Sequence, residues 1–258
     1  MTTPGHILWH LGPQKTGSTS LQALLLANRG LLRPHCLVFP KREGTKRARF
    51  AAHDWYGGGD VAPLRTALRD LTAKLAPADA ATMIVSDETL LGFELAGTED
   101  HALTRAARLI PELIAASSPH RASIILFTRA RGPWLRSAYN QAVRQMRETR
   151  SFEAWHAEVA LPPDWPAWES ALRPLAPDLH FIALEDDPQP GLALLRLAGV
   201  PDDVRAALAP ATARNESLPP GAIAFLREMN ASPLNGRALA EVRARVVAQP
   251  HLFASEPV

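Results

Sequence analysis

The chain has 258 residues, of which 47% are hydrophobic and 21% are charged, a composition that excludes a disordered or collagen-like chain. A net charge of +2 is too small to indicate a nucleic-acid partner, and a single cysteine, Cys36, excludes an internal disulfide. No stretch reaches the roughly 18–20 apolar residues of a membrane span, and the first residues lack the basic start and apolar run of a signal peptide, so we expect a mature cytoplasmic protein without a membrane span.

Segments typical of strands alternate with segments typical of helices along the chain. The expected strands are 6–11, 35–39, 82–86, 122–128 and 179–184. The expected helices are 17–32, 61–75, 101–117, 133–149, 152–175, 191–198, 220–230 and 236–247. Residues 41–60 are polar and basic and then glycine-rich, so we expect a long surface loop there. The alternation predicts a three-layer α/β fold, with a central, mostly parallel sheet of about five strands in a single domain, residues 1–258.

The segment after the first expected strand has the features of a phosphate-binding loop. Gly12 and Gly17 allow unusual backbone dihedrals and a close approach of the backbone to a ligand. The segment opens a helix, whose first N–H groups and dipole favour an anion. Lys15 adds a positive charge, and three hydroxyl side chains add donors: Ser18, Thr19 and Ser20.

The spacing of this loop differs from the Walker A pattern, G-x-x-x-x-G-K-[ST]. Gly12 and Gly17 have the Walker separation, but Ser18 stands where the lysine belongs, and Lys15 lies two residues before the second glycine. The loop is therefore not a standard nucleoside-triphosphate loop. The alternative to a phosphate-binding role is a polar loop whose serine or threonine side chains cap the helix.

The same segment resembles the 5′-phosphosulfate loop, P-K-[ST]-G-[ST]-T-x-L, of sulfotransferases that use 3′-phosphoadenosine-5′-phosphosulfate (PAPS) as sulfonate donor. Here it reads Pro13-Gln14-Lys15-Thr16-Gly17-Ser18-Thr19-Ser20-Leu21, and the inserted Gln14 is similar to bacterial members. The resemblance implies that the donor, and its product adenosine 3′,5′-bisphosphate, are held by Gln14, Lys15, Thr16, Gly17, Ser18, Thr19 and Ser20.

A second motif follows the expected strand 122–128. Arg129 at the strand's end can form a two-pronged contact with a phosphate, and Ser137, eight residues later, can donate a hydroxyl to the same anion. In the sulfotransferase family, an arginine and a serine at this spacing bind the 3′-phosphate of the donor. The resemblance implies the same role for Arg129 and Ser137. Arg214 begins a segment that resembles the loop closing over the nucleotide in bacterial members.

The resemblance implies in-line transfer of a sulfonate group to an acceptor hydroxyl, with no metal required. Lys15 would neutralise the charge on the bridging oxygen as the bisphosphate leaves. The acceptor is expected to be a small molecule or a carbohydrate. Residues 41–60 and the region Trp155–Trp168 are candidates for its pocket, although packing is the alternative role for Trp155, Trp165 and Trp168.

An acceptor hydroxyl also needs a general base, for which the sequence offers three candidates. Glu88 follows the strand 82–86 at the expected ligand-binding edge, although the alternative is that Ser86 or Asp87 caps a helix with acidic residues in its first turn. His53 lies in the segment 41–60, where a surface histidine is the alternative. His10 ends the first strand, where a buried core histidine is the alternative.

Two other functions stay open. One is a small-molecule kinase or NTPase, in which residues 83–88 form a Walker B strand and Asp87 holds magnesium. The other is a nucleotide-binding protein without catalytic activity, because a fold does not by itself imply turnover.

Overall fold

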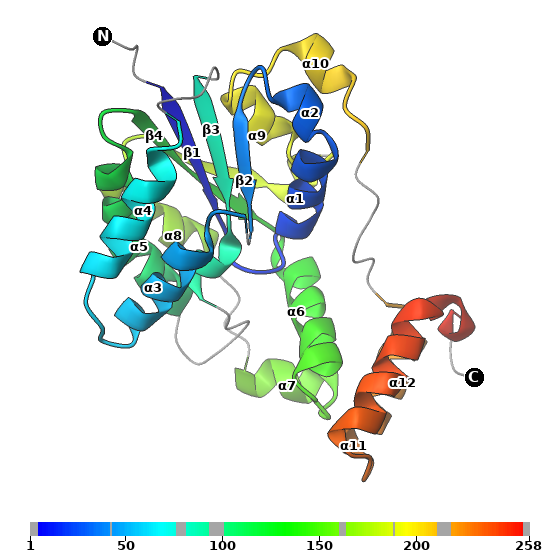
Figure 1. The fold of residues 1–258 in the computed structure, drawn as a ribbon. Coiled ribbons are helices and arrows are strands. Elements are labelled where there is room, and N and C mark those ends of the chain that lie inside the picture. The colour runs from blue at the N-terminus through cyan, green and yellow to red at the C-terminus, as the bar shows by residue number, and fades with distance from the viewer. Residues whose placement is uncertain are drawn as a thin grey trace. The chain divides into compact units, whose positions relative to one another are not determined.

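Five parallel strands form one sheet in the part of the chain that the computed structural model describes, residues 5–41, 43–75, 81–92, 101–159, 164–187, 189–210 and 218–254. The strands are β1 (His6–Leu11), β2 (Leu37–Pro40), β3 (Thr82–Ser86), β4 (Arg121–Thr128) and β5 (Leu179–Ala183). Their order is β2-β3-β1-β4-β5, and each neighbouring pair runs parallel (Figure 1). The predicted α/β fold with a central parallel sheet is confirmed.

Helices cover both faces of this sheet and complete the three layers (Figure 1). One face packs against α3 (Lys46–Tyr56), α4 (Ala62–Thr72), α5 (His101–Ser117) and α8 (Trp165–Leu172). The other face packs against α1 (Ser18–Ala27), α2 (Arg29–Leu32), α9 (Leu192–Leu197) and α10 (Asp202–Ala206). Short 3₁₀ helices are η1 (Glu88–Leu91), η2 (Arg173–Leu175), η3 (Leu184–Asp186) and η4 (Pro250–Phe253).

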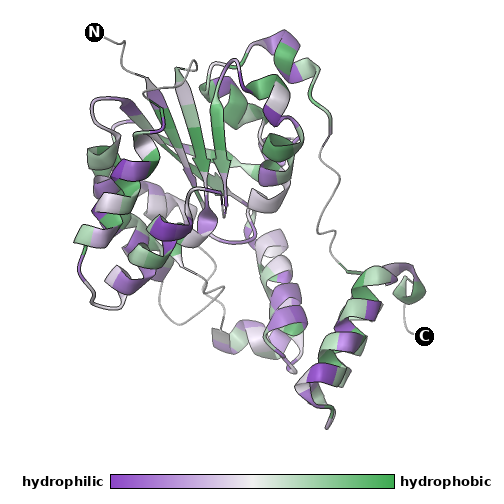
Figure 2. Cartoon of the chain, viewed as in Figure 1, coloured by the Kyte–Doolittle hydropathy of each residue, from purple (hydrophilic) through white to green (hydrophobic). Residues whose placement is uncertain are grey.

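The central strand β1 contributes to both hydrophobic cores. Trp9 packs with the α3–α5 side and Leu8 with the α1 side, because successive side chains of a strand point to opposite faces. Both residues are fully buried. Since both faces are covered, the strands are hydrophobic on successive residues, as Figure 2 shows for the sheet.

The chain divides into two compact units. The first contains the sheet and the helices that cover it. The second contains α6 (Arg131–Gln145), α7 (Phe152–Val159), α11 (Pro220–Ala231), α12 (Gly236–Ala248) and η4. Its own core includes Trp134, Tyr139, Trp155, Ile223 and Leu226. The single domain expected from the sequence stays a prediction.

The expectation of a long loop over residues 41–60 is wrong, because α3 occupies most of it. Ala48 and Ala52, one helical turn apart, are buried in the core beside the sheet. Their small side chains give only a weak periodic signal among basic neighbours. The expected helix 152–175 is wrong as a single element, because α7, α8 and η2 are separate there. The other expected elements are present with shifted ends, except that Asn28 separates α1 from α2 and α10 was not expected. In the described ranges no helix is long and apolar enough to cross a bilayer.

Candidate functional site

The loop between β1 and α1 forms a tight turn. Lys15 has a positive φ of 74°, which is uncommon for a residue with a side chain, and Gly17 has a φ of 92°. A Cβ at Gly17 would lie 2.7 Å from Cδ1 of Leu184, so both the dihedral and the space favour glycine. The buried Thr16 hydroxyl donates to the Pro13 carbonyl at 2.9 Å and holds the turn closed. Thr16 therefore has a structural role inside the loop.

The same loop sets the start of α1. Gly17 occupies the N-cap position, and its carbonyl accepts from the N–H groups of Ser20 and Leu21. The first N–H groups of a helix have no partner within the helix and are available to an anion. Thr19 is exposed, Ser20 is half-buried and Ser18 is buried. Gln14 donates through Nε2 to the Gly92 carbonyl at 3.4 Å.

Arg129 lies beside this loop, as the sequence predicts for a phosphate-binding arginine. It follows the end of β4, which pairs directly with β1. Its half-buried guanidinium donates from Nη1 to the Lys15 carbonyl at 3.3 Å. Trp165 Nε1 donates to the Arg129 carbonyl at 2.8 Å and fixes the backbone there. The structure thus brings Arg129 and the predicted phosphate loop together.

The sequence also predicts that Ser137 and Arg214 hold the nucleotide. Ser137 is half-buried on α6 and belongs to the second compact unit, so its pairing with Arg129 stays a prediction. Arg214 lies outside the described residues.

Glu88 is buried at the carboxyl end of β3, where both of its carboxylate oxygens are bound. Lys41 Nζ donates to Oε1 at 2.6 Å and Gln22 Nε2 donates to Oε2 at 2.8 Å. Burial alone would raise the pKa of Glu88, but Lys41 and Gln22 outweigh it and lower the pKa below its usual range. Glu88 is therefore ionised at neutral pH. The carboxyl end of β3 lies beside β1, whose end leads into the phosphate loop.

The two histidine candidates differ from Glu88 in their partners. The half-buried His53 lies on α3, and its Nε2 donates to the Thr89 carbonyl at 2.7 Å. His10 is fully buried, with its Nδ1 2.8 Å from the Ser86 hydroxyl. Burial lowers the pKa of His10 to about 4, although the nearby Glu88 carboxylate opposes the shift. His10 is therefore neutral at physiological pH.

Asp87 caps η1, which is the structural role that the sequence offered as its alternative. Its carboxylate accepts from the Thr89 N–H at 3.0 Å and from the Thr89 hydroxyl. The Thr45 hydroxyl donates to its second oxygen at 2.7 Å. Both carboxylate oxygens of the buried Asp87 therefore have hydrogen-bond donors.

The tryptophans named for the acceptor pocket mainly have packing roles. Trp155 and Trp168 are 2% and 0% exposed and belong to separate hydrophobic cores. Trp165 is half-buried, and its indole N–H is bound to the Arg129 carbonyl.

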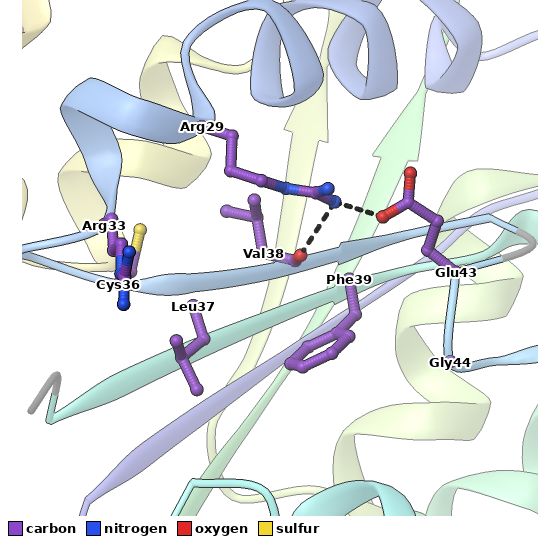
Figure 3. A pocket seen from close by; sticks show the side chains of 8 residues that line it. All are labelled: Arg29, Arg33, Cys36, Leu37, Val38, Phe39, Glu43 and Gly44. Carbon is purple, nitrogen blue, oxygen red and sulfur yellow. Dashed lines mark hydrogen bonds and ion pairs between the residues drawn. The ribbon is translucent and has the colours of Figure 1, made fainter. Parts of the chain in front are cut away.

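A cavity of about 490 Å³ lies along the edge strand β2 (Figure 3). It is lined by Arg29, Arg33, Cys36, Leu37, Val38, Phe39, Glu43 and Gly44. The Arg29 guanidinium donates to the Val38 carbonyl at 3.4 Å and pairs with the Glu43 carboxylate, as Figure 3 shows. None of the residues predicted to bind phosphate lines this cavity.

Sequence reasoning missed two partners of the site, Lys41 and Gln22. Lys41 follows β2, which neighbours β3 in the sheet, and one signal was its rarity: the chain has four lysines. Gln22 lies five residues after Gly17 on α1 and is the residue that links the helix of the phosphate loop to Glu88.

Comparison with known proteins returned no relative: no protein-family model, curated protein or solved structure matches the chain. The resemblance to PAPS-dependent sulfotransferases therefore rests on the two sequence motifs.

Proposed function

We propose that the protein is a sulfotransferase that moves a sulfonate group from PAPS to an acceptor hydroxyl. The observation that carries the proposal is the phosphosulfate-like loop at the end of the central strand β1, with Arg129 bound to its backbone. Positive φ angles at Lys15 and Gly17 shape this loop as a turn that leads into the N-terminus of α1. Ligands of parallel α/β folds bind at this edge of the sheet.

The proposed reaction is a direct displacement at sulfur. The acceptor oxygen forms a bond to sulfur while the bond from sulfur to the bridging oxygen of the 5′-phosphosulfate breaks. The electron pair of that bond leaves with the bridging oxygen as adenosine 3′,5′-bisphosphate. Lys15 stabilises the charge that develops on this oxygen, and the loop holds the two reactants in line.

The acceptor proton goes to Glu88 in this proposal. Glu88 is ionised at neutral pH and follows the end of β3, next to the strand that leads into the loop. The alternative base His53 donates from Nε2 to a backbone carbonyl, and Nδ1 of His10 lies 2.8 Å from the Ser86 hydroxyl. We propose a polar acceptor, a carbohydrate or another small hydroxyl compound.

The direct test is transfer of radiolabelled sulfonate from PAPS to a panel of sugars and other hydroxyl compounds. Wild type is compared with Lys15→Ala and with Lys46→Ala, an exposed lysine on α3 that serves as the matched control. We expect transfer by wild type and by Lys46→Ala and the loss of most turnover in Lys15→Ala. Turnover in Lys15→Ala equal to that of wild type would contradict the role in sulfonate transfer that is proposed for the loop. Phosphoryl transfer from ATP with magnesium, and none from PAPS, would indicate the kinase alternative.

A further inference from the structure

Two buried polar atoms beside Gly12 have no hydrogen-bond partner among the described residues. They are Nε2 of His10, whose side chain is 0% exposed, and the hydroxyl of Ser18, which is 5% exposed. A Cβ placed on Gly12 would lie 3.8 Å from Nε2 of His10 and 3.9 Å from the Ser18 hydroxyl. Both atoms therefore border the same small space in front of the Gly12 backbone. Buried polar atoms nearly always have partners, so this space is a candidate for a ligand atom.

A chain of hydrogen bonds fixes which nitrogen of His10 carries the proton. It begins at Glu88, whose carboxylate accepts from Lys41 and from Nε2 of Gln22. An ionised carboxylate only accepts, so the nitrogen of the Gln22 amide must face Glu88. The same nitrogen lies 3.2 Å from the Ser86 hydroxyl and 3.3 Å from the Ser86 carbonyl. An amide nitrogen only donates, so the Ser86 hydroxyl accepts from Gln22.

The Ser86 hydroxyl must then donate its own proton. Ser86 is fully buried, and the one acceptor recorded for this hydroxyl in the described ranges is Nδ1 of His10, at 2.8 Å. Nδ1 is thus the unprotonated nitrogen. Since burial keeps the imidazole neutral, the proton lies on Nε2, the atom that faces the space beside Gly12.

We propose that the Nε2–H of His10 and the hydroxyl of Ser18 form a two-donor subsite for one oxygen of a tetrahedral oxyanion at the phosphate loop. An anionic oxygen can accept from both donors at once, and the helix N-terminus that begins at Ser18 favours its charge. The identity of the oxyanion rests on the proposed function: if the protein is a sulfotransferase, the oxyanion is the 5′-phosphosulfate of PAPS.

The subsite assigns His10 a role different from that of a general base. Its basic nitrogen is occupied by Ser86, and the nitrogen that faces the loop already carries a proton. The neutral His10 side chain donates a hydrogen bond to PAPS. Glu88 remains the proposed acceptor of the proton from the acceptor hydroxyl. The chain from Glu88 through Gln22 and Ser86 holds the His10 ring in this tautomer.

The first test is nitrogen NMR of histidine-labelled wild-type protein, with the His10 signal assigned by its loss in His10→Asn. We expect a protonated Nε2 and an unprotonated Nδ1 in the free protein. Inorganic sulfate, and separately adenosine 3′,5′-bisphosphate, should shift the Nε2–H signal. A proton on Nδ1, or an Nε2 signal that neither anion moves, overturns the subsite.

The second test compares two substitutions that keep different halves of the imidazole. The amide of His10→Asn reaches the position of Nδ1 and keeps the bond to Ser86, whereas the amide of His10→Gln reaches the position of Nε2 and keeps a donor there. Calorimetric titration with the bisphosphate should show affinity weakened about 10- to 100-fold in His10→Asn and much less in His10→Gln, as expected for one hydrogen bond to a charged group. Equal affinity in wild type and His10→Asn overturns the subsite.

The outcomes separate this inference from the proposed function. Bisphosphate binding that His10→Asn leaves unchanged refutes the subsite and leaves the sulfotransferase proposal standing. A protonated Nε2 that responds to inorganic sulfate, in a protein that does not bind the bisphosphate, supports the subsite and refutes the nucleotide site.

Discussion

Acid should destabilise the fold through His10. Burial lowers the pKa of this histidine from 6.5 to about 4, so in this pH range the unfolded chain binds a proton that the folded chain does not. The stability that depends on neutral His10 is complete above pH 6.5 and is lost as the pH falls toward 4. Because each pKa unit corresponds to ~1.4 kcal/mol, the loss is on the order of 3 kcal/mol.

The assay is urea unfolding of wild type and His10→Asn at a series of pH values between 7 and 4.5. Asparagine keeps the bond to Ser86 but does not titrate, so the difference between the two unfolding free energies isolates His10. We expect wild type to lose more stability than the variant as the pH falls. His251→Asn, which removes an exposed histidine, is the control and should follow wild type. Parallel curves for wild type and His10→Asn would refute the reasoning.

Three further predictions concern the phosphate loop, the proposed base Glu88 and the hydrogen bonds of Asp178 at the amino ends of β4 and β5. Gly12→Ala places a methyl group 3.1 Å from the Thr16 hydroxyl and in the space that His10 borders. Calorimetry should therefore show an affinity for the bisphosphate that is reduced about 10-fold or more. Unchanged affinity would show that the ligand lies elsewhere. Glu88→Gln should reduce sulfonate transfer about 100-fold or more, and normal turnover would move the base role to another residue. Burial would raise the pKa of Asp178, but bonds from Ser123, Arg121 and His180 lower it to about 2. Its contribution to stability is therefore present above about pH 4 and is lost as the pH falls toward 2. The unfolding free energy of Asp178→Asn should therefore fall less than that of wild type between pH 4 and 2. The same fall in both proteins would contradict the role given to Asp178.

The sheet was predictable from the sequence because its strands are buried on both faces. Ile124 to Phe127 on β4 are apolar without interruption, which is typical of a central parallel strand. Helix α3 was not predictable in the same way. Its buried residues are Ala48, Arg49 and Ala52, so that its hydrophobic periodicity is faint.

The phosphate loop was predictable because its residues are contiguous, whereas the network around Glu88 was not. Lys41 follows β2, Gln22 lies on α1 and Glu88 begins η1, and only the strand order β2-β3-β1 brings their side chains together. A sequence does not by itself give the order of strands in a sheet. The partners of His10 depend on the same register, in which His10 pairs with Ser86 across β1 and β3.

Calorimetric titration with adenosine 3′,5′-bisphosphate, beside ATP with magnesium, tests the nucleotide site most directly. The proteins are wild type, Arg129→Ala and, as the matched control, Arg131→Ala, an exposed arginine two residues further along. Wild type and Arg131→Ala should bind the bisphosphate, and Arg129→Ala should bind it about 10-fold more weakly or worse, since a charged hydrogen bond is lost. Binding of ATP with magnesium but not of the bisphosphate, or equal affinity in Arg129→Ala, would contradict the account.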